Sequence, residues 1–167
     1  ADGVNVGAGS WDEQADKTEQ PQHELNMPYE YYMARYPVTV AQYKLFVEQS
    51  GYKTTDEDSL RGISNHPVVR VSWYDSLEYC KWLDQNLKRL SLKKVKEIQE
   101  KDQFAFWQGL AEDRLHISLP SEAEYEKVAR GSDGRIYPWG NEFDPNKANM
   151  LDTGIDTISA VGCFPTG

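Results

Sequence analysis

The chain has 167 residues, which is enough for one domain with a substantial core. Its net charge of −9 and its pI near 4.8 argue against binding to nucleic acid or to an anionic membrane, because phosphate groups would be repelled. No apolar run reaches the length of about 18 residues that a membrane-spanning helix needs, and the first residues lack the basic-then-apolar pattern of a signal peptide. The chain starts and stops inside patterned sequence, so we expect it to be part of a longer polypeptide.

The two cysteines, Cys80 and Cys163, are too few and too widely spaced for a disulfide framework, and the sequence has no CxxC motif. This usage fits a reducing compartment, and we expect a cytoplasmic protein. Cys80 lies on the apolar side of a predicted helix, and Cys163 lies in a strand-like run. Both are therefore interpreted as small buried hydrophobic residues.

The first third of the chain predicts two strands and one helix. A short strand is expected at residues 4–6, followed by a polar loop, and a half-buried, aromatic-rich strand is expected at residues 29–39. Thr39 and Gln42 have the spacing of a capping box, in which each side chain satisfies a backbone N–H. The helix that begins there ends at Gly51 and is predicted to turn one apolar side inward, made of Val40, Tyr43, Phe46 and Val47.

A second helix is expected to begin after Ser72, a good N-cap residue, with Asp75 placed favourably near the positive end of the helix dipole. Its inward stripe is predicted to contain Trp73, Leu77 and Cys80. Residues 88–116 are highly charged and indicate a helical insertion at the periphery, with a surface that docks a partner as the sharper alternative. The insertion carries the basic cluster of the chain, which we interpret as a solvated face: Lys88, Arg89, Lys93, Lys94 and Lys96.

The stretch "LPSEAEYEKVARGSDGRIYPWG" predicts a third helix with both ends defined. Ser121 and Glu124 form another capping box, and Gly131 is expected to end the helix. Its inward face is predicted to contain Tyr125, Val128 and Ala129. Turns follow, and "SAVGCF" predicts a last short strand. Tyr137 and Trp139 could stack on a ligand, although Trp139 is better explained as a plug of the core.

Five segments, taken together, resemble the formylglycine-generating enzyme family, also called the sulfatase-modifying-factor domain. They are "EQPQHEL" (19–25), "ARYPVTVAQYKLFVEQSGY" (34–52), "NHPVVRVSWYDSLEYCKWL" (65–83), "SLPSEAEYEKVARGSDGRIYPWGNEFDPNKAN" (118–149) and "SAVGCFPTG" (159–167). The resemblance implies an α+β fold, a variant of the C-type lectin fold with a small antiparallel sheet, two main helices and much irregular backbone. It also implies one domain over residues 1–167 that is incomplete at its C-terminal end.

The resemblance does not carry a catalytic residue to this chain. In formylglycine generators, a cysteine pair in the C-terminal part of the domain binds copper and oxidises a substrate cysteine with oxygen. Cys80 and Cys163 do not match those positions, so copper is expected only if a further C-terminal part carries the pair. The chain also departs from the family at Val40, where Asn is common, and at Ser118, where Arg is common.

Calcium is the cofactor that the resemblance implies most directly. The family binds it in the loop after the "PWG" segment, which corresponds here to "KANMLDTGIDT". Asn149 matches the family's asparagine, and a hard cation of this kind takes six to eight oxygen ligands. The remaining candidates are backbone oxygens of Met150 and Ile155 and a carboxylate of Asp152 or Asp156.

Other groups that could carry chemistry have structural explanations. Glu122 and Glu124 are accounted for by the helix dipole and the capping box rather than by acid–base catalysis. His66 is interpreted as a hydrogen-bonded turn residue, and His23 and His116 are isolated, so the sequence predicts no zinc site.

Two functions from different classes remain. The first is a non-catalytic module of a larger bacterial protein that recognises a protein or a small ligand, with no nucleic acid or membrane as partner. The second is the N-terminal portion of a copper-dependent oxidase that makes formylglycine from a substrate cysteine. The remainder of the domain itself, as a second polypeptide, is a further candidate partner.

Overall fold

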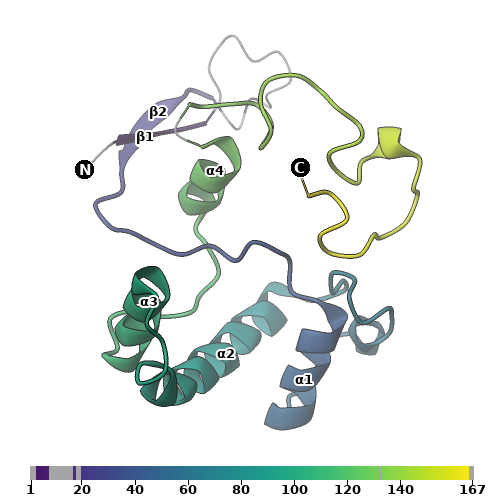
Figure 1. Cartoon of the computed structure of the whole chain (residues 1–167). Coiled ribbons are helices and arrows are strands. Elements are labelled where there is room, and N and C mark those ends of the chain that lie inside the picture. Colours follow the sequence, from purple (N-terminus) through teal and green to yellow (C-terminus); the bar gives the residue numbers. More distant parts are fainter. Residues whose placement is uncertain (1–2, 8–16, 18–19, 132, 166–167) are drawn as a thin grey trace. The chain divides into compact units, whose positions relative to one another are not determined.

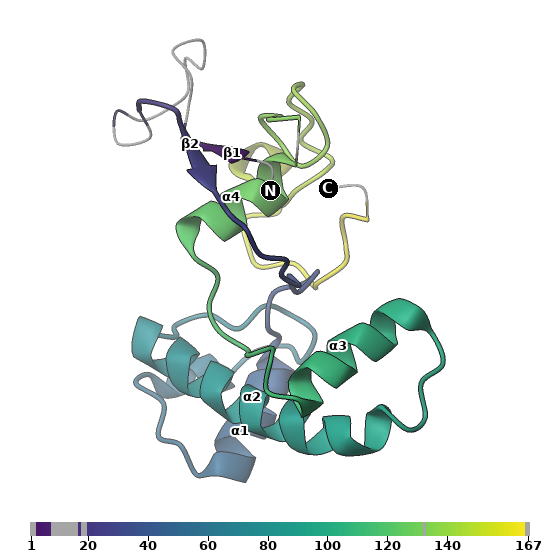
Figure 2. The same ribbon diagram turned by 90° about the vertical axis from the view of Figure 1, so that its left-hand side faces the viewer.

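The structure is a computed structural model that describes residues 3–7, 17, 20–131 and 133–165, with the backbone alone at residues 3–5. It divides into two compact units (Figures 1 and 2). We call Pro37–Leu119 the helical unit, and Ala1–Tyr36 with Pro120–Gly167 the terminal unit. Among the described residues, no helix is both long enough and apolar enough to cross a lipid bilayer.

The helical unit contains three α-helices, α1 (Val40–Ser50), α2 (Trp73–Lys94) and α3 (Lys101–Ala111), and the 3₁₀ helix η2 (Glu57–Leu60). Helix α1 packs against α2, and α3 packs against the other end of α2 (Figures 1 and 2). The predicted capping box of Thr39 and Gln42 is present, and Gly51 ends α1 with a φ of 68°. Sequence signals that act within a few residues were therefore sufficient to define this helix.

An aromatic cluster forms the core of the helical unit. Tyr43 and Phe46 of α1 are almost completely buried, and Tyr79 of α2 joins them. The ring centroids of Tyr43 and Tyr79 lie 6.1 Å apart, and those of Phe46 and Tyr79 lie 5.6 Å apart at nearly right angles. Trp82 packs against Phe46 at 5.6 Å. The predicted inward face of α1 is confirmed.

The predicted inward stripe of α2 is confirmed at Cys80 and is wrong at Trp73. Cys80 is buried, whereas Trp73 is 62% exposed. The reason is that the buried side of α2 passes through Asp75, Tyr79 and Cys80, and Trp73 occupies the first helical turn outside that line. Helix α2 also continues to Lys94, so residues 88–94 extend it and α3 provides the second helix of the region predicted as an insertion.

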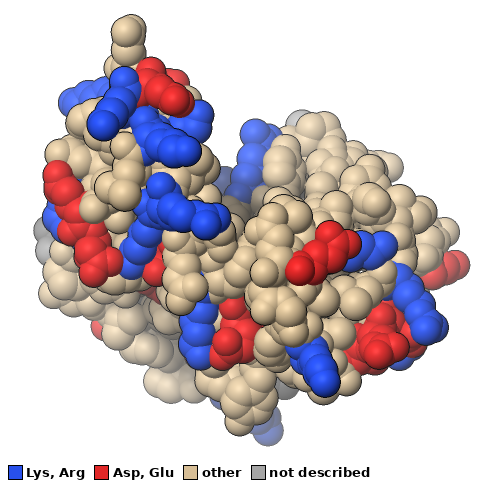
Figure 3. All heavy atoms as spheres, turned by 90° about the horizontal axis from the view of Figure 1, so that it is seen from below, with Lys and Arg blue, Asp and Glu red and all other residues tan. Residues whose placement is uncertain are grey.

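Two of the five residues of the basic cluster, Lys88 and Lys94, pair with neighbouring carboxylates. The ammonium of Lys88 lies 2.9 Å from the Asp84 carboxylate and 2.5 Å from that of Asp113, and Lys94 pairs with Glu97 at 3.1 Å. On the face drawn in Figure 3, basic and acidic side chains are interspersed. These observations support the interpretation of the cluster as a solvated face.

The terminal unit contains a two-stranded antiparallel sheet of β1 (Gly3–Val6) and β2 (His23–Asn26), with Val6 opposite His23. The strand predicted at residues 4–6 is confirmed, and its partner lies in a region that was predicted as loop. Helix α4 (Glu122–Arg130) packs beside β1. The predicted capping box of Ser121 and Glu124 and the stop at Gly131 are confirmed.

Two predicted strands are wrong. Residues 29–39 form irregular backbone, with one isolated bridge between Thr39 and Pro67. Proline occurs at positions 28 and 37 and supplies no N–H to a ladder. The segment "SAVGCF" is a turn, because Gly162 has a φ of 79° and the Cys163 N–H donates to Ala160. Cys163 is consequently exposed rather than buried.

The predicted inward face of α4 is also wrong at Tyr125 and Val128, which are 65% and 50% exposed. No residue of α4 is buried among the described residues. The side of the helix that contacts β1 carries polar side chains instead. Glu126 and Arg130 of α4 hydrogen-bond to the backbone of Gly7, which follows β1, and this contact is part of the candidate site.

Candidate functional site

The loop predicted to bind calcium is closed by the side chain of Asn149. Its Nδ2 donates to the carbonyl oxygen of Thr157 at 2.8 Å and to the hydroxyl oxygen of Ser159 at 3.1 Å. The sequence reasoning identified Asn149 but missed Thr157 and Ser159. The signal that could have indicated them is the pair of hydroxyl residues shortly after the aspartates in "DTGIDTIS".

The other predicted ligands lie on the turn that follows Asn149. The carbonyl oxygen of Met150 accepts hydrogen bonds from the Thr153 N–H at 3.1 Å and from the Thr153 hydroxyl. The side chains of Asp152, Ile155 and Asp156 are exposed. No interaction brings Asp152 or Asp156 to the Asn149 amide within the described part of the chain.

The loop is rich in the kind of atom that calcium prefers, because its carbonyl, hydroxyl and carboxylate oxygens are hard ligands. Its carboxylates are not gathered, and the described residues contain no group of three or more His, Cys, Asp or Glu side chains that could hold a metal ion. The ligand types fit the ion, and calcium at Asn149 stays a prediction.

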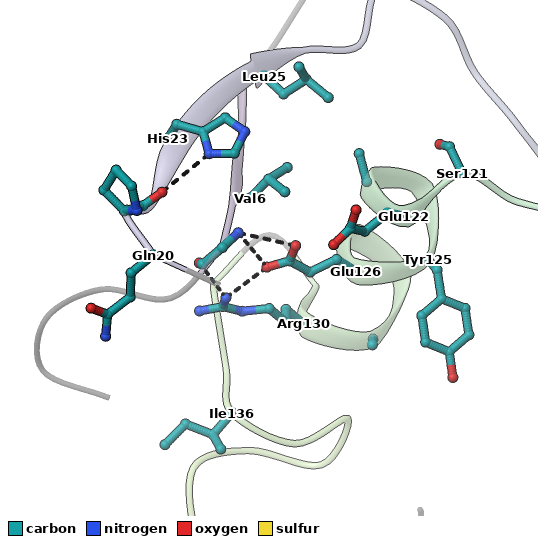
Figure 4. A pocket seen from close by; sticks show the side chains of 14 residues that line it. Val6, Gln20, His23, Leu25, Ser121, Glu122, Tyr125, Glu126, Arg130 and Ile136 are labelled. Carbon is teal, nitrogen blue, oxygen red and sulfur yellow. Dashed lines mark hydrogen bonds and ion pairs between the residues drawn. The ribbon is translucent and has the colours of Figure 1, made fainter. Parts of the chain in front are cut away.

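A second candidate site is a pocket of about 910 Å³ within the terminal unit (Figure 4). Strands β1 and β2 and helix α4 line it, and the segments after β1 and α4 complete it. A volume of about 300–1,000 Å³ with apolar walls and a few convergent polar groups is typical of small-ligand sites. The apolar walls include Val6, Leu25, Ala129 and Ile136, and the polar groups include His23, Ser121, Glu122, Glu126 and Arg130.

Glu126 and Arg130 clamp the backbone of Gly7 at one wall of this pocket (Figure 4). The Gly7 N–H donates to both carboxylate oxygens of Glu126, at 2.9 and 3.1 Å. Arg130 Nη1 donates to the Gly7 carbonyl oxygen at 2.8 Å and to Glu126 Oε1 at 2.8 Å. The ion pair of Glu126 and Arg130 on α4 thus satisfies both the backbone N–H and the backbone carbonyl oxygen of Gly7, which follows β1.

The clamp was missed in the sequence, although its signal is simple. Glu126 and Arg130 lie four residues apart, which places them on one face of a helix. The partner, Gly7, is distant in sequence and has a φ of 86°, a left-handed conformation that favours glycine. The pair is partly buried, with side-chain exposures of 16% for Arg130 and 20% for Glu126, so it is screened less than a surface pair.

Glu124 is committed to the start of α4. Its carboxylate accepts from the Ser121 N–H at 2.7 Å and from the Ser121 hydroxyl at 2.8 Å. The backbone N–H of Ser121, followed by its hydroxyl, lowers the pKa of Glu124 below the ordinary value. A carboxylate that is held ionised in this way is poorly suited to be a general acid. The structural explanation of Glu124 is confirmed.

Tyrosines of the irregular segment that precedes the helical unit contact the same helix. The Tyr31 hydroxyl donates to the Glu124 carbonyl oxygen at 2.9 Å, and the Lys127 ammonium lies 6.0 Å from the centre of the Tyr31 ring. Tyr29 packs edge-on against Tyr31 at 6.4 Å. Tyr29 remains 52% exposed, and neither tyrosine lines the pocket of β1, β2 and α4.

The two cysteines are free. Burial of Cys80 inside α2 raises the pKa of its thiol, which disfavours the thiolate that acts as nucleophile or metal ligand. Cys163 is exposed on its turn. Neither thiol lies in the pocket of β1, β2 and α4.

Comparison with protein families matches residues 1–165 to the family described as "Sulfatase-modifying factor enzyme 1-like domain". Among similar proteins, "Inactive C-alpha-formylglycine-generating enzyme 2" of Bos taurus is 30% identical over 110 residues, which cover 59% of this chain and 26% of that protein. "Formylglycine-generating enzyme" of Thermomonospora curvata is 34% identical over 82 residues, which cover 48% of this chain and 16% of that protein.

A third relative has a different printed activity. "Serine/threonine-protein kinase Pkn1" of Chlamydia trachomatis is 27% identical over 172 residues, which cover 91% of this chain and 22% of that protein. The chain therefore spans about a quarter or less of the length of these relatives.

Proposed function

Because the chain belongs to the sulfatase-modifying factor enzyme 1-like family, we propose that it is a formylglycine-generating-enzyme-like domain that acts as a non-catalytic recognition module. It would bind a protein or a small ligand within a larger bacterial protein. The observation that carries this proposal is the state of the two thiols. Cys80 is buried with a raised thiol pKa and Cys163 is exposed on a turn, so neither has the setting of a reactive cysteine pair.

Copper does not fit the cysteines of this chain. A soft thiolate pair suits copper, and such ligands must be deprotonated. Burial of the Cys80 thiol opposes deprotonation, and Cys163 has no second cysteine near it in the sequence. The similarity to relatives whose printed name is "inactive" supports a role without this chemistry.

The pocket of β1, β2 and α4 supports recognition rather than catalysis. The Glu126 carboxylate and the Arg130 guanidinium both hydrogen-bond to the Gly7 backbone. They therefore hold the wall of the pocket in place rather than act on a substrate. The imidazole of His23 lies 3.3 Å from the Pro21 carbonyl oxygen, at the opposite wall. A ligand would meet apolar surface at Leu25 with few polar groups to orient it.

The family membership also supports the finer features expected of such a domain. These are a fold of the C-type-lectin type and a single domain over residues 1–167 with residues 88–116 as an insertion. The proposed cytoplasmic location rests on the two free cysteines alone. Unpaired cysteines are usual in a reducing compartment, which fits that location.

The second candidate function is the N-terminal portion of a copper-dependent oxidase that converts a substrate cysteine to formylglycine. The relatives named "Formylglycine-generating enzyme" favour it. Neither cysteine of this chain matches the copper-binding pair, so the activity would require residues outside the present sequence.

An oxidation assay on the complete protein separates the two functions. The protein is incubated with copper, oxygen and a cysteine-containing peptide of the sulfatase type, and the peptide is analysed by mass spectrometry. We expect the peptide to keep its sulfur. Conversion of the cysteine to formylglycine, at a rate that depends on added copper, would overturn the non-catalytic proposal.

Calcium binding in the loop of residues 149–159 is tested by thermal unfolding in excess calcium and in excess chelator. An ion at about 100 times its dissociation constant adds about 2.7 kcal/mol to the free energy of unfolding, and a melting rise of several degrees follows. Asn149→Ala should abolish this calcium-dependent rise, whereas Asn65→Ala, at an exposed position in the helical unit, should keep it. Equal melting temperatures with calcium and with chelator would refute the site.

A further inference from the structure

Some polar side chains of the pocket of β1, β2 and α4 are already committed to other groups of the protein. The Ser121 hydroxyl donates to the Glu124 carboxylate at 2.8 Å and accepts from the Glu124 N–H at 3.3 Å. Arg130 Nη1 donates to the Gly7 carbonyl oxygen and to the Glu126 carboxylate. The charge of Arg130 is therefore balanced by Glu126 and adds no net positive charge to the pocket.

The Glu122 carboxylate, by contrast, is uncommitted. It lies one helical turn before Glu126 on α4 and lines the pocket, and Figure 4 shows it directed from the helix toward the strands. Glu122 has no hydrogen bond or ion pair with any residue that the structure describes. Because Glu126 is paired with Arg130, Glu122 gives the pocket a net negative charge when His23 is neutral.

His23 adds an acceptor on the opposite wall. Its Nδ1 lies 3.3 Å from the Pro21 carbonyl oxygen, which can only accept, so this contact is a hydrogen bond when Nδ1 carries the proton. In that tautomer Nε2 is an acceptor. The Gln20 amide offers a donor and an acceptor alike, and Tyr125 points away from the strands in Figure 4. The uncommitted groups between the strands and α4 are thus mainly acceptors.

Much of the remaining lining is aliphatic. Val6 lies opposite His23 in the register of the sheet, and Leu25 lies two residues after His23, so the three side chains share one face. Leu25 and Ile136 are 39% and 38% exposed, which leaves their surface accessible to a ligand. The aliphatic lining consists of Val6, Pro21, Leu25, Ala123, Ala129 and Ile136.

We propose that the pocket binds a ligand that joins an ammonium group to a short aliphatic body, which rests on the proposed recognition function and names its ligand class. An ammonium group carries three N–H donors and no acceptor, so it complements the acceptors of Glu122 and His23. The ion pair with Glu122 would form beside aliphatic walls, where water and salt screen it less than on an open surface. The aliphatic body would cover Leu25 and Ile136.

Competing ligand classes fit the same lining less well. An anion would be repelled by Glu122 and by the net charge of −9 on the chain, and Arg130 is already paired with Glu126. A neutral aliphatic ligand would use the walls but leave Glu122 without a partner. An alkylamine and the N-terminus of a peptide with an aliphatic first residue share the proposed chemistry, and the experiment separates these two sources.

The test is an NMR titration of the ¹⁵N-labelled 167-residue chain at neutral pH with hexylammonium, hexanol and hexanoate, which share one aliphatic body. We expect hexylammonium to shift the backbone N–H signals of Ala123, Ala129 and Ile136, with a dissociation constant in the millimolar range. Hexanol should bind about threefold more weakly and hexanoate more weakly still. Butylammonium, which is shorter by two methylene groups, should bind about tenfold more weakly than hexylammonium, because apolar burial contributes to affinity.

Two exposed positions provide variants that should keep the fold. Glu122→Gln should lower the affinity for hexylammonium to that for hexanol and leave hexanol binding unchanged. Leu25→Ala should weaken the binding of hexylammonium and of hexanol by the same factor. The matched control is Glu142→Gln, which makes the same charge change at an exposed position of the terminal unit outside the pocket and should bind like the parent chain.

Leucinamide and N-acetyl-leucinamide separate the two sources of the ligand, because they share a side chain and only the first carries an ammonium group. Tighter binding of leucinamide than of hexylammonium would assign the site to peptide N-termini, and the reverse order would assign it to alkylamines. Either order supports the ligand class, provided that N-acetyl-leucinamide binds more weakly than leucinamide.

Three outcomes would overturn the ligand class: hexanol binding as tightly as hexylammonium, a preference for ammonium that Glu122→Gln keeps, or no shift at the residues of the pocket. Hexanol binding without a preference for ammonium would leave the pocket as a recognition site. Conversion of a peptide cysteine to formylglycine by the complete protein would refute the non-catalytic function without changing the preference for ammonium. The two proposals can therefore fail separately.

Discussion

Asp75→Asn should strongly destabilise the helical unit. Asp75 has no exposed surface, and its two carboxylate oxygens accept five hydrogen bonds. Oδ1 accepts from the Thr55 N–H at 3.0 Å, from the Thr55 hydroxyl and from the Tyr52 hydroxyl. Oδ2 accepts from the Ser72 N–H at 2.7 Å and from the Ser72 hydroxyl at 2.6 Å.

Asparagine cannot satisfy these donors in either orientation. The hydroxyls of Ser72, Thr55 and Tyr52 can rotate to accept, but the N–H groups of Ser72 and Thr55 cannot. The amide nitrogen of the variant must therefore face one of these two backbone donors. A buried unsatisfied donor costs about 1–3 kcal/mol, and hydrogen bonds to a charged acceptor are each worth about 1 kcal/mol more than neutral ones. In the less costly orientation the amide oxygen keeps the two bonds from Ser72, which become neutral, so the total is about 3–5 kcal/mol.

The measurement is urea unfolding at pH 7, followed by tryptophan fluorescence, since Trp82 packs against the core. With a slope of about 2 kcal/mol per molar, the loss corresponds to a midpoint lower by about 2 M. The control is Asp102→Asn at an exposed position of α3, which should change the free energy of unfolding by less than about 0.5 kcal/mol. If Asp75→Asn shifts the midpoint no more than this control, the reasoning is refuted.

The same carboxylate predicts a pH dependence. Burial of Asp75 raises its pKa, but the hydrogen bonds from Ser72 and Thr55 outweigh burial and hold the pKa well below its usual range. The stabilisation is therefore fully present above the unfolded-state value of about 3.9 and is lost as the pH falls below it. The parent chain should lose stability between about pH 5 and pH 2 more steeply than Asp75→Asn, and parallel curves would contradict this assignment.

Two further substitutions test the packing of each unit. Glu126→Ala should release the Gly7 N–H from its carboxylate acceptor, and hydrogen exchange of the Gly7 amide should accelerate about tenfold or more, whereas Glu122→Ala should leave it unchanged. Gly109→Ala would place a methyl group 2.6 Å from the Leu115 side chain, so it should destabilise the helical unit by about 1–3 kcal/mol in urea unfolding. The double variant with Leu115→Ala should show no additional loss from Gly109→Ala, and strictly additive losses would contradict the overlap.

The sequence predicted features that are specified within three or four residues. The capping boxes at Thr39 and Ser121 and the glycine stops at Gly51 and Gly131 depend on local geometry, and all are present. The buried face of α1 follows from helical periodicity, and it is present as well. Capping chemistry and the 3.6-residue period of a helix were sufficient to predict these elements.

The features that the sequence did not predict depend on partners that are distant in the chain. Strand β2 exists because it pairs with β1 across an intervening loop, and its own residues show no strong strand pattern. The clamp joins Gly7 to Glu126, which are separated by 119 positions. Tyr125 was assigned inward from periodicity, but α4 attaches through its polar side. Periodicity identifies an apolar face without identifying what covers it.

The two units are stabilised in different ways, and this difference bears on where recognition occurs. The helical unit has an aromatic core at Tyr43, Phe46 and Tyr79, in which close packing leaves little space for a ligand. In the terminal unit, α4 has no buried residue and is attached through hydrogen bonds of Glu126 and Arg130. Polar contacts of this kind fix positions without filling space, and the pocket of β1, β2 and α4 lies in this unit. Substitutions in the aromatic core should therefore change stability, whereas those that line this pocket should change binding first.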